Sequence, residues 1–374
     1  MSIVKLGDVA VESRETCKGD KSGLPIVGLE HVTPEEVMLS NWATDTENTF
    51  TKMFRKGDML FGRRRAYLKK AAQAPFDGIC SGDITVIRAK TDKLLPDLLP
   101  FIIQNDDLFD FAVGKSAGSL SPRVKWENLK NYTFNLPILD EQKKLVEVLW
   151  AINDTLQAYQ KLLRETDELV KSQFIEMFYS KGYPLKSISD VIDKNIMRVG
   201  KVFDQGDVIQ YLDISSIDSS LKKVIGTTEY ILENAPSRAQ YVLKNNDILY
   251  STVRPNLQNI AINPYDDENI IGSTGFCVLR CKLVLPGYMW GVITSDKFTN
   301  EMVNRTSSAN YPAVTDKVVY AYEIPVPPVE EQKRFEIFVK QSDKSKFALQ
   351  NSIAAAQATK RSLITDIFGL ERKE

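Results

Sequence analysis

The sequence predicts an α+β protein made of two similar globular domains that are separated by two long helices. Three observations support this prediction. The chain of 374 residues repeats itself at a period of about 190 residues. Each repeat ends in a long segment without proline or glycine. The rest of each repeat mixes short β-type runs, such as 82–89 and 275–281, with turns and short helical stretches, such as 96–111. A period this long indicates a duplicated domain rather than a solenoid unit.

Short motifs carry the repeat, and they occur in the same order in both halves. The matched pairs are Leu6-Gly7-Asp8-Val9 with Ile188-Ser189-Asp190-Val191, Arg55-Lys56-Gly57-Asp58-Met59-Leu60 with Lys244-Asn245-Asn246-Asp247-Ile248-Leu249, Arg65 with Arg254, and Asp140-Glu141-Gln142-Lys143 with Glu330-Glu331-Gln332-Lys333. We therefore expect domain 1 at residues 1–139, a central helix at 140–180, domain 2 at 181–329 and a C-terminal helix at 330–374.

The two segments without proline or glycine, 141–178 and 331–368, are predicted to be helices with a narrow heptad seam. The seam positions are Leu145, Leu149, Ile152, Leu156, Tyr159, Leu163, Thr166, Val170, Gln173 and Met177 in the first, and Phe335, Val339, Ser342, Lys346, Leu349, Ile353, Ala356, Lys360, Leu363 and Ile367 in the second. Such a helix is about 57 Å long, whereas a domain of this size is about 30 Å across.

Each long helix must therefore bury part of its seam on something beyond its own domain. The other helix is the obvious candidate, and isologous pairing of similar units favours an antiparallel coiled coil with internal pseudo-two-fold symmetry. The alternative is two separate amphipathic helices, each lying on its own domain.

Composition and charge exclude several classes of function. The net charge of −1 argues against a uniformly basic nucleic-acid binder, so any DNA contact must be local or shared with a basic partner. His31 is the only histidine, which argues against a Ser-His-Asp triad, a histidine-rich metal site and an HExxH helix. Nothing resembles a signal peptide or a membrane span, so we expect a cytoplasmic protein that does not contact a membrane.

The cysteines and two chance motifs give no catalytic or metal site. Cys277 and Cys281 are close together but lack the second half of a zinc site, so we expect the cysteines to be reduced core thiols. Gly114-Lys115-Ser116 lacks the leading glycine and the strand of a phosphate loop. Asn263-Pro264-Tyr265-Asp266 lacks the second proline of an adenine-methyltransferase loop. The sequence therefore predicts no catalytic residue, no metal ligand and no cofactor bound by this chain.

Polar residues suited to binding DNA lie at matching places in the two halves. The segments 50–70 and 240–259 are predicted to form strand, Asp-containing turn and strand, with the polar residues displayed by a hairpin. The candidates are Arg63, Arg64, Arg65, Tyr67, Lys69 and Lys70 in the first half, and Arg254, Asn256, Gln258 and Asn259 in the second. The first group suits phosphates and guanine, and the amides of the second suit adenine edges. The alternative is a solvated hairpin with surface charge.

A second pair of matching loops is small and rich in hydroxyl groups. These loops, 115–123 and 305–312, have side chains and amides that could contact phosphates or bases. The candidates are Ser119, Ser121, Arg123, Arg305, Ser307, Asn310 and Tyr311. The alternative is an ordinary turn before a strand, but the repetition of both loops favours function.

The whole chain resembles a type I restriction-modification specificity (S) subunit, in which two variable target-recognition domains alternate with two similar helical regions. The most specific markers are Leu136-Pro137-Ile138-Leu139-Asp140-Glu141-Gln142-Lys143 and Pro325-Val326-Pro327-Pro328-Val329-Glu330-Glu331-Gln332-Lys333, each of which opens a long helix. The resemblance lies in the proline followed by Glu-Gln, which occurs twice at the family's spacing.

The resemblance implies a sequence-specific DNA-binding subunit without catalytic activity of its own. Each domain would bind one half of a split, asymmetric target in double-stranded DNA, and the helices would set the spacer. It also implies two methyltransferase (M) subunits, which carry S-adenosylmethionine and methylate adenine N6. In a complete restriction system, two restriction (R) subunits that use ATP and Mg would join them. With a net charge near zero, we expect the isolated chain to bind DNA weakly.

Two other classes of function remain open at this point. The chain could be an adaptor whose duplicated domains bind proteins and whose coiled coil is a spacer; dispensable arginines and capture of a peptide would favour this. It could also be a nuclease with an unrecognised site, which metal-dependent DNA cleavage by the purified chain would reveal.

Overall fold

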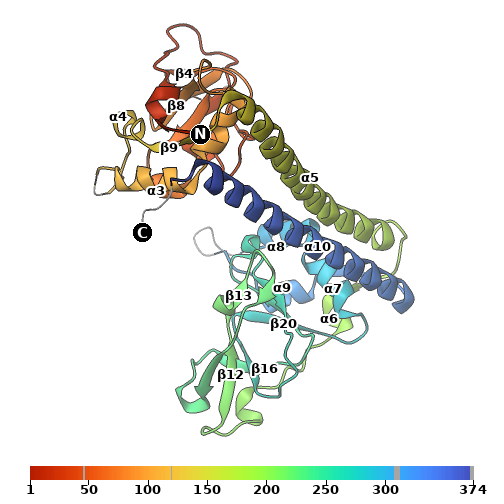
Figure 1. The fold of residues 1–374 in the computed structure, drawn as a ribbon. Helices are drawn as coiled ribbons and strands as arrows, with labels where there is room; N and C mark the ends of the chain where they lie inside the picture. Colours follow the sequence, from red (N-terminus) through yellow and green to blue (C-terminus); the bar gives the residue numbers. More distant parts are fainter. Residues whose placement is uncertain (45–46, 119, 307–311, 371–374) are drawn as a thin grey trace. The chain divides into compact units, whose positions relative to one another are not determined.

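The computed structural model describes residues 1–44, 47–118, 120–306 and 312–370 (Figure 1). The chain forms two compact units, the first comprising Met1–Leu162 and Leu349–Glu374 and the second Leu163–Ala348. The division passes through the two long helices. Each unit therefore contains one globular part and a portion of both helices.

The globular part of the first unit is mixed α and β. Its strands are β1 (Ser2–Lys5), β2 (Ala10–Glu12), β3 (Ile26–Val27), β4 (Lys52–Phe54), β5 (Met59–Gly62), β6 (Ala71–Gln73), β7 (Gly78–Cys80), β8 (Ile84–Ala89) and β9 (Thr133–Leu136). Its short helices are α1 (Leu6–Val9), α2 (Leu99–Ile103), α3 (Asp106–Gly114) and α4 (Trp126–Leu129). The helical stretch expected at 96–111 is thus confirmed as α2 and α3, after a 3-10 turn.

The second unit repeats this order and adds a small hairpin. Its strands are β10 (Leu185–Ser187), β11 (Ile192–Asp193), β12 (Val208–Leu212), β13 (Ile217–Asp218), β14 (Lys223–Val224), β15 (Thr228–Ile231), β16 (Ala239–Val242), β17 (Ile248–Ser251), β18 (Ile260–Ile262), β19 (Ile270–Ser273), β20 (Phe276–Cys281) and β21 (Glu323–Pro325). Its short helices are α6 (Ile188–Val191), α7 (Pro286–Ile293), α8 (Asp296–Asn304) and α9 (Asp316–Tyr320). The hairpin is β13–β14.

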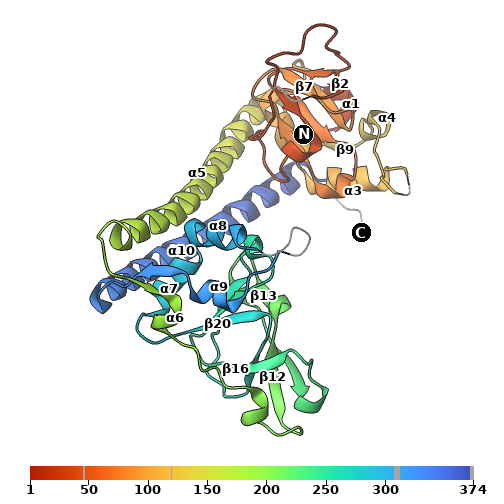
Figure 2. The same cartoon turned by 180° about the vertical axis from the view of Figure 1, so that it is seen from behind.

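Sheet topology shows the same plan in both units. The order β2-β8-β5-β6 in the first unit matches β11-β20-β17-β18 in the second, and β3-β7-β4 matches β12-β19-β16, to which the second unit adds β15 at the edge. The pair β1–β9 likewise matches β10–β21. In the second unit, α7, α8 and α9 gather near β20, and β12 and β16 lie away from them (Figures 1 and 2). The duplication predicted from the sequence is therefore a duplication of the fold.

Strand β5 in the first unit and strand β17 in the second each lie between two hydrophobic cores. In β5, Met59 and Phe61 face a cluster built with α2 and α3, whereas Leu60 faces a cluster built with β3 and β7. The same alternation occurs along β17, where Leu249 lies in a different cluster from its two neighbours. Because side chains alternate across a strand, one buried strand serves both cores. These strands consequently consist of apolar residues almost throughout.

The expected hairpins at 50–70 and 240–259 are wrong in their pairing. β4 pairs with β7, whereas β5 pairs with β8 and β6. The strand–turn–strand order is correct, but the turn carries the chain from one sheet to the next. Asp58 at this turn is buried, accepts the backbone N–H of Arg55 (2.8 Å) and binds the guanidinium of Arg88 (2.7 and 2.8 Å). The polar residues lie instead on the β5–β6 and β17–β18 connections.

The two long helices are α5 (Leu139–Phe178) and α10 (Val329–Phe368), each of 40 residues. They begin one residue before the expected starts at 140 and 330 and end at the phenylalanines, before the expected ends at 180 and 374. All twenty predicted seam residues are buried or partly buried, which confirms the seam. In the first unit Leu149 near the start of α5 shares a core with Ile364 and Phe368 near the end of α10. In the second unit Phe174 near the end of α5 lies 5.2 Å, centroid to centroid, from Phe335 near the start of α10.

A buried glutamine fixes the start of each long helix. Gln142 donates to the carbonyl of Pro137 (2.9 Å) and accepts the backbone N–H of Leu95 (3.0 Å). Gln332 makes the same two contacts, with Pro327 (2.8 Å) and Leu285 (2.8 Å). Both side chains are almost fully buried, where an unsatisfied amide would be costly. The Glu-Gln motif therefore ties each helix to the loop before α2 or α7.

Candidate nucleic-acid interface

The β5–β6 and β17–β18 connections share an unusual backbone. Arg65 and Lys69 flank a short 3-10 turn, η2 (Ala66–Leu68), and both have left-handed φ values, 54° and 50°. Arg254 and Gln258 flank η7 (Pro255–Leu257) with φ values of 51° and 48°. Left-handed backbone is uncommon for residues with a Cβ and persists where the surroundings hold it. The two loops thus have one geometry and different side chains.

Backbone contacts join the two predicted binding places in each half. The backbone N–H of Arg65 donates to the carbonyl of Pro122 (2.9 Å), and that of Arg254 donates to the carbonyl of Pro312 (2.7 Å). Isolated β-bridges join Arg64 to Arg123 and Val253 to Ala313. The C-terminal end of the hydroxyl-rich loop, at Pro122 or Pro312, therefore lies against the β5–β6 or β17–β18 connection. No local sequence pattern indicates this adjacency, because it depends on pairing between segments more than fifty residues apart.

In the first unit, arginines from both loops converge on Asp83, which the sequence did not single out. Arg123 binds its carboxylate through Nε (2.7 Å) and Nη2 (3.2 Å), and Arg64 Nη1 lies 3.6 Å away. Arg64 Nε also donates to the hydroxyl of Ser121 (2.6 Å). The hydrogen bond from Arg123 holds the pKa of Asp83 below its usual value, so the carboxylate is charged at neutral pH. Three predicted residues thus form one cluster.

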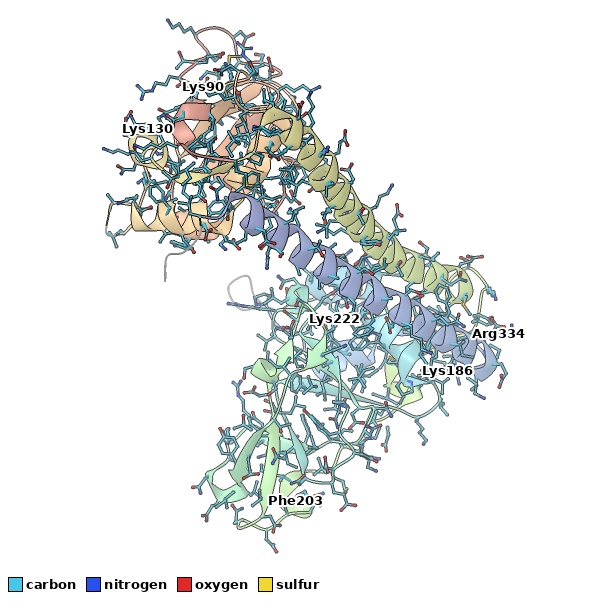
Figure 3. All side chains as sticks on the ribbon, viewed as in Figure 1. Lys90, Lys130, Lys186, Phe203, Lys222 and Arg334 are labelled. Carbon is cyan, nitrogen blue, oxygen red and sulfur yellow. The ribbon has the colours of Figure 1, made fainter. Side chains whose placement is uncertain are left out.

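Other predicted residues bind their own unit. Lys69 Nζ contacts the carboxylate of Asp106 (2.5 Å), and Lys70 Nζ donates to the carbonyl of Leu29 (2.7 Å). Gln258 Nε2 donates to the hydroxyl of Thr299 (2.7 Å), and its Oε1 accepts from Lys222, which lies in the turn between β13 and β14 and is labelled in Figure 3. Lys69 and Gln258 therefore fasten the left-handed turns to α3 and α8. These side chains are therefore less free to contact a base than the prediction from the sequence assumes.

Several candidates are displayed to solvent. Arg65 and Tyr67 on the first connection are exposed, as are Arg254 and Asn256 on the second, and Asn259 is partly buried. Among the described residues, the buried Nε of Arg63 has no hydrogen-bond partner. Arg305 is exposed and forms an ion pair with Glu301 (2.6 Å) one turn earlier in α8. The candidates Ser119, Ser307, Asn310 and Tyr311 lie outside the described residues.

A basic hollow lies beside the first residue of the hydroxyl-rich loop of the second unit. It has a volume of about 790 Å³, and Arg305, at the start of that loop, forms part of its wall. Three lysines, Lys194, Lys297 and Lys317, line it from three different segments, together with the carboxylates of Glu301 and Glu323. Positive charge is therefore concentrated here in a chain whose net charge is −1.

The matching positions of the first unit have the opposite charge. β2 and β11 pair alike with β8 and β20, α3 and α8 begin alike after Asn105 and Ser295, and α4 and α9 begin alike after Lys125 and Thr315. By this correspondence, the three lysines replace Glu12, Asp107 and Glu127. Arg14 pairs with both glutamates (3.0 and 3.7 Å), which neutralises part of that surface.

The single histidine and the four cysteines lie in settings that are typical of structural residues. His31 Nδ1 accepts the backbone N–H of Gly28 (2.9 Å). All four cysteines are free; Cys80 and Cys277 are buried, and Cys17 and Cys281 are partly buried. Burial raises the pKa of the Cys80 and Cys281 thiols to about 12, which disfavours the thiolate that binds metals. Across the described ranges, no three acidic, histidine or cysteine side chains group as a metal site, and no helix is long and apolar enough to span a membrane.

Comparison with known proteins agrees with this organisation. The family model for the type I restriction modification DNA specificity domain matches residues 1–165 and again 181–356. The specificity subunit of the type I restriction enzyme HindI from Haemophilus influenzae is 26% identical over 160 residues, which are 42% of this chain and 32% of that protein. The EcoDI specificity subunit from Escherichia coli is 28% identical over 148 residues, 37% of this chain and 33% of that protein. The matched region thus spans about a third of these two relatives.

Longer similarity is found to other proteins. The putative MjaX specificity subunit from Methanocaldococcus jannaschii is 19% identical over 357 residues, 84% of this chain and 79% of that protein. A chain from a structure on assembly and conformational transition of the type I R-M system has a TM-score of 0.60 at 19% identity, with 98% of this chain and 97% of that chain covered. The type I restriction-modification S subunit from M. genitalium has a TM-score of 0.53 at 10% identity, with 99% and 96% covered. The fold is therefore shared, and because the family model covers most of the sequence, this chain belongs to the type I restriction-modification DNA specificity family.

Proposed function

We propose that this chain is the non-catalytic specificity subunit of a type I restriction-modification complex and that each unit reads one half of a bipartite, asymmetric DNA target. The observation that carries the proposal is the duplicated left-handed loop. Both copies keep the same backbone and an exposed arginine, Arg65 or Arg254, while the surrounding side chains differ. A constant scaffold with variable polar side chains suits reading of two different base sequences.

The long helices suit the role of a spacer. In the first unit the start of α5 packs beside the end of α10, and in the second unit the end of α5 packs beside the start of α10. This order of contacts supports antiparallel pairing as a coiled coil with pseudo-two-fold symmetry. A helix of 40 residues is about 60 Å long at 1.5 Å per residue. Such a length would separate two DNA-reading domains by a fixed distance.

The proposed partners supply the chemistry. Two methyltransferase subunits would bring S-adenosylmethionine to adenine N6, and two restriction subunits with ATP and Mg would complete an endonuclease. His31, the single histidine, is engaged with the backbone of Gly28, which gives no support to a hydrolytic role for this chain. The net charge of the chain is close to zero, so the partners would also provide cationic contacts to phosphates.

The test is a genome-wide map of N6-methyladenine in cells that express this chain with its neighbouring methyltransferase. We expect a split, asymmetric motif. Exchange of residues 1–139 with those of another specificity chain should change the first half of the motif alone, and exchange of 181–329 should change the second half alone. If no motif appears while the same methyltransferase is active beside another specificity chain, the adaptor hypothesis replaces this one.

A further inference from the structure

Asp83 holds arginines from two separate loops of the first unit. It lies just before β8, and its side chain is 21% exposed. Its carboxylate binds Arg123 through two N–H groups and lies 3.6 Å from Arg64, while Ser121 holds the Nε of Arg64. The charges of Arg123, Arg64 and Arg63 all act on Asp83. The cluster is therefore an anchored group of cations with one carboxylate at its centre.

The geometry leaves one edge of Arg123 available. Asp83 occupies the Nε–Nη2 edge, at 2.7 and 3.2 Å. A guanidinium has five N–H donors in a rigid fork, so both N–H groups of Nη1 and one of Nη2 remain. The side chain of Arg123 is 40% exposed, so it is in contact with solvent as well as with Asp83. One N–H group of Nη1 and one of Nη2 can point in parallel, and such a pair of donors matches the O6 and N7 acceptors of guanine in the major groove.

The second unit shows that the loop does not need this acid in order to fold. The backbone N–H of Arg63 donates to the carbonyl of Asp83 (3.0 Å), and at the matching place the N–H of Thr252 donates to the carbonyl of Gly275 (3.2 Å). The bridge between Arg64 and Arg123 is likewise matched by the bridge between Val253 and Ala313. The same backbone thus forms in the second unit, where Gly275, Val253 and Ala313 take the places of Asp83, Arg64 and Arg123. A loop-closing role alone does not explain the cluster.

We infer that Asp83 is a positioning residue that orients Arg123, with Arg64 beside it, to read a guanine in the first half-site; the inference rests on the proposed function. The carboxylate fixes the guanidinium plane before DNA arrives, which lowers the entropy lost on binding. It also opposes nonspecific attraction to phosphate, because a negative charge next to the arginines weakens a purely electrostatic contact. The second unit has no equivalent of this arrangement at Gly275, Val253 and Ala313.

The experiment compares variants of the full chain in complex with its methyltransferase on DNA duplexes that carry each single-base change of the mapped motif. For Asp83→Ala, we expect discrimination at one guanine of the first half-site to fall by at least about fivefold, the lower end of what a bidentate arginine contributes. Discrimination in the second half-site should be unchanged. Asp83→Glu keeps a carboxylate and should restore part of the discrimination, and Asp92→Ala, an exposed acid of the same unit, should have the wild-type pattern.

Discrimination between bases separates positioning from structure. Loss of folding would lower methylation of all duplexes together and would not alter the ratio between cognate and changed sites. The inference is overturned if Asp83→Ala and Asp83→Glu both keep the wild-type ratios, if all ratios stay constant while total activity falls, or if the first half-site contains no guanine. If the wild-type complex produces no motif at all, the proposed function fails, and the inference fails with it.

Discussion

The two units differ where DNA would be bound and agree where the fold is held together. Both have a buried aspartate that caps a turn and binds an arginine, Asp58 with Arg88 and Asp247 with Arg280. In contrast, the left-handed turn is fastened by an ion pair to Asp106 in the first unit and by a neutral hydrogen bond from Gln258 in the second. Comparison of the two halves of one chain therefore separates residues of the scaffold from residues of the proposed recognition surface.

The shared Asp–Arg pair should be the most sensitive part of the scaffold, and more so in the second unit. Asp247→Ala removes the carboxylate partner of Arg280, whose side chain is 14% exposed and would keep the neutral carbonyl of Val242 (3.1 Å), and should cost about 3–5 kcal/mol. Asp58→Ala should cost less, about 2 kcal/mol, because Arg88 is 38% exposed and retains Glu15 at 2.8 Å. Amide hydrogen exchange in β17 and β5 measures each loss locally.

Asp266→Ala, a change at an exposed acid of the second unit, serves as the control and should leave exchange in β17 unaltered. Equal losses for the two buried aspartates would contradict the difference in solvent access of their arginines. A loss of stability below about 1 kcal/mol for Asp247→Ala would mean that the Asp–Arg pair does not hold the fold together.

The glutamines at the helix starts should have similar effects, because they share two buried contacts, although Gln142 also donates to the carbonyl of Lys93 (3.0 Å). Gln142→Ala and Gln332→Ala each leave a buried backbone N–H and a buried carbonyl without the amide partner, which should cost about 2–3 kcal/mol. Urea unfolding would measure both. Lys143→Ala and Lys333→Ala, at the exposed neighbouring positions, should have little effect. A large effect in one half alone would mean that the two junctions are not equivalent.

Local patterns allowed much of the fold to be predicted. The absence of proline and glycine defined both long helices, and heptad spacing identified their buried seams. Strand pairing could not be predicted, since β4 and β5 are adjacent in sequence but belong to different sheets. The position of Asp83 was missed for the same reason: its arginine partners lie 19 and 40 residues away in the chain, and side-chain pairing at that separation depends on tertiary structure. Asp58 was noticed as a turn residue, but its buried pairing with Arg88 was not.

The lysines that line the basic hollow of the second unit should contribute to the salt dependence of DNA binding. Replacing Lys194, Lys297 and Lys317 with glutamine should lower the slope of log affinity against log salt by about 0.9 for each phosphate that is no longer neutralised, up to about 3. Fluorescence anisotropy with the full chain in complex with its methyltransferase and the target duplex measures this slope. Three exposed lysines outside the hollow provide the matched control: Lys223, Lys244 and Lys282. Equal slopes for the two triple variants would mean that the hollow does not bind phosphates.

The smallest expected effect concerns acid and the Asp83 cluster. Hydrogen bonding to Arg123 lowers the pKa of Asp83 in the folded chain. The stability that this pair contributes is therefore present above the ordinary aspartate pKa of about 3.9 and is lost as the pH falls through the lower folded value. Wild type should exceed Asp83→Asn in stability by less than about 1 kcal/mol near pH 7, because both side chains are partly exposed.

This difference should shrink as the pH falls below about 4 and disappear once Asp83 is protonated in the folded chain. Hydrogen exchange at the amide of Arg63, measured between pH 3 and 7, reports on the first unit, and the amide of Thr252 beside Gly275 is the internal control. A difference that persists unchanged at pH 3 would mean that the Asp83→Asn substitution disturbs the loop through the shape of the amide rather than through loss of charge. The second unit, which folds the same loop around a glycine, should show no corresponding change in either the wild type or the variant.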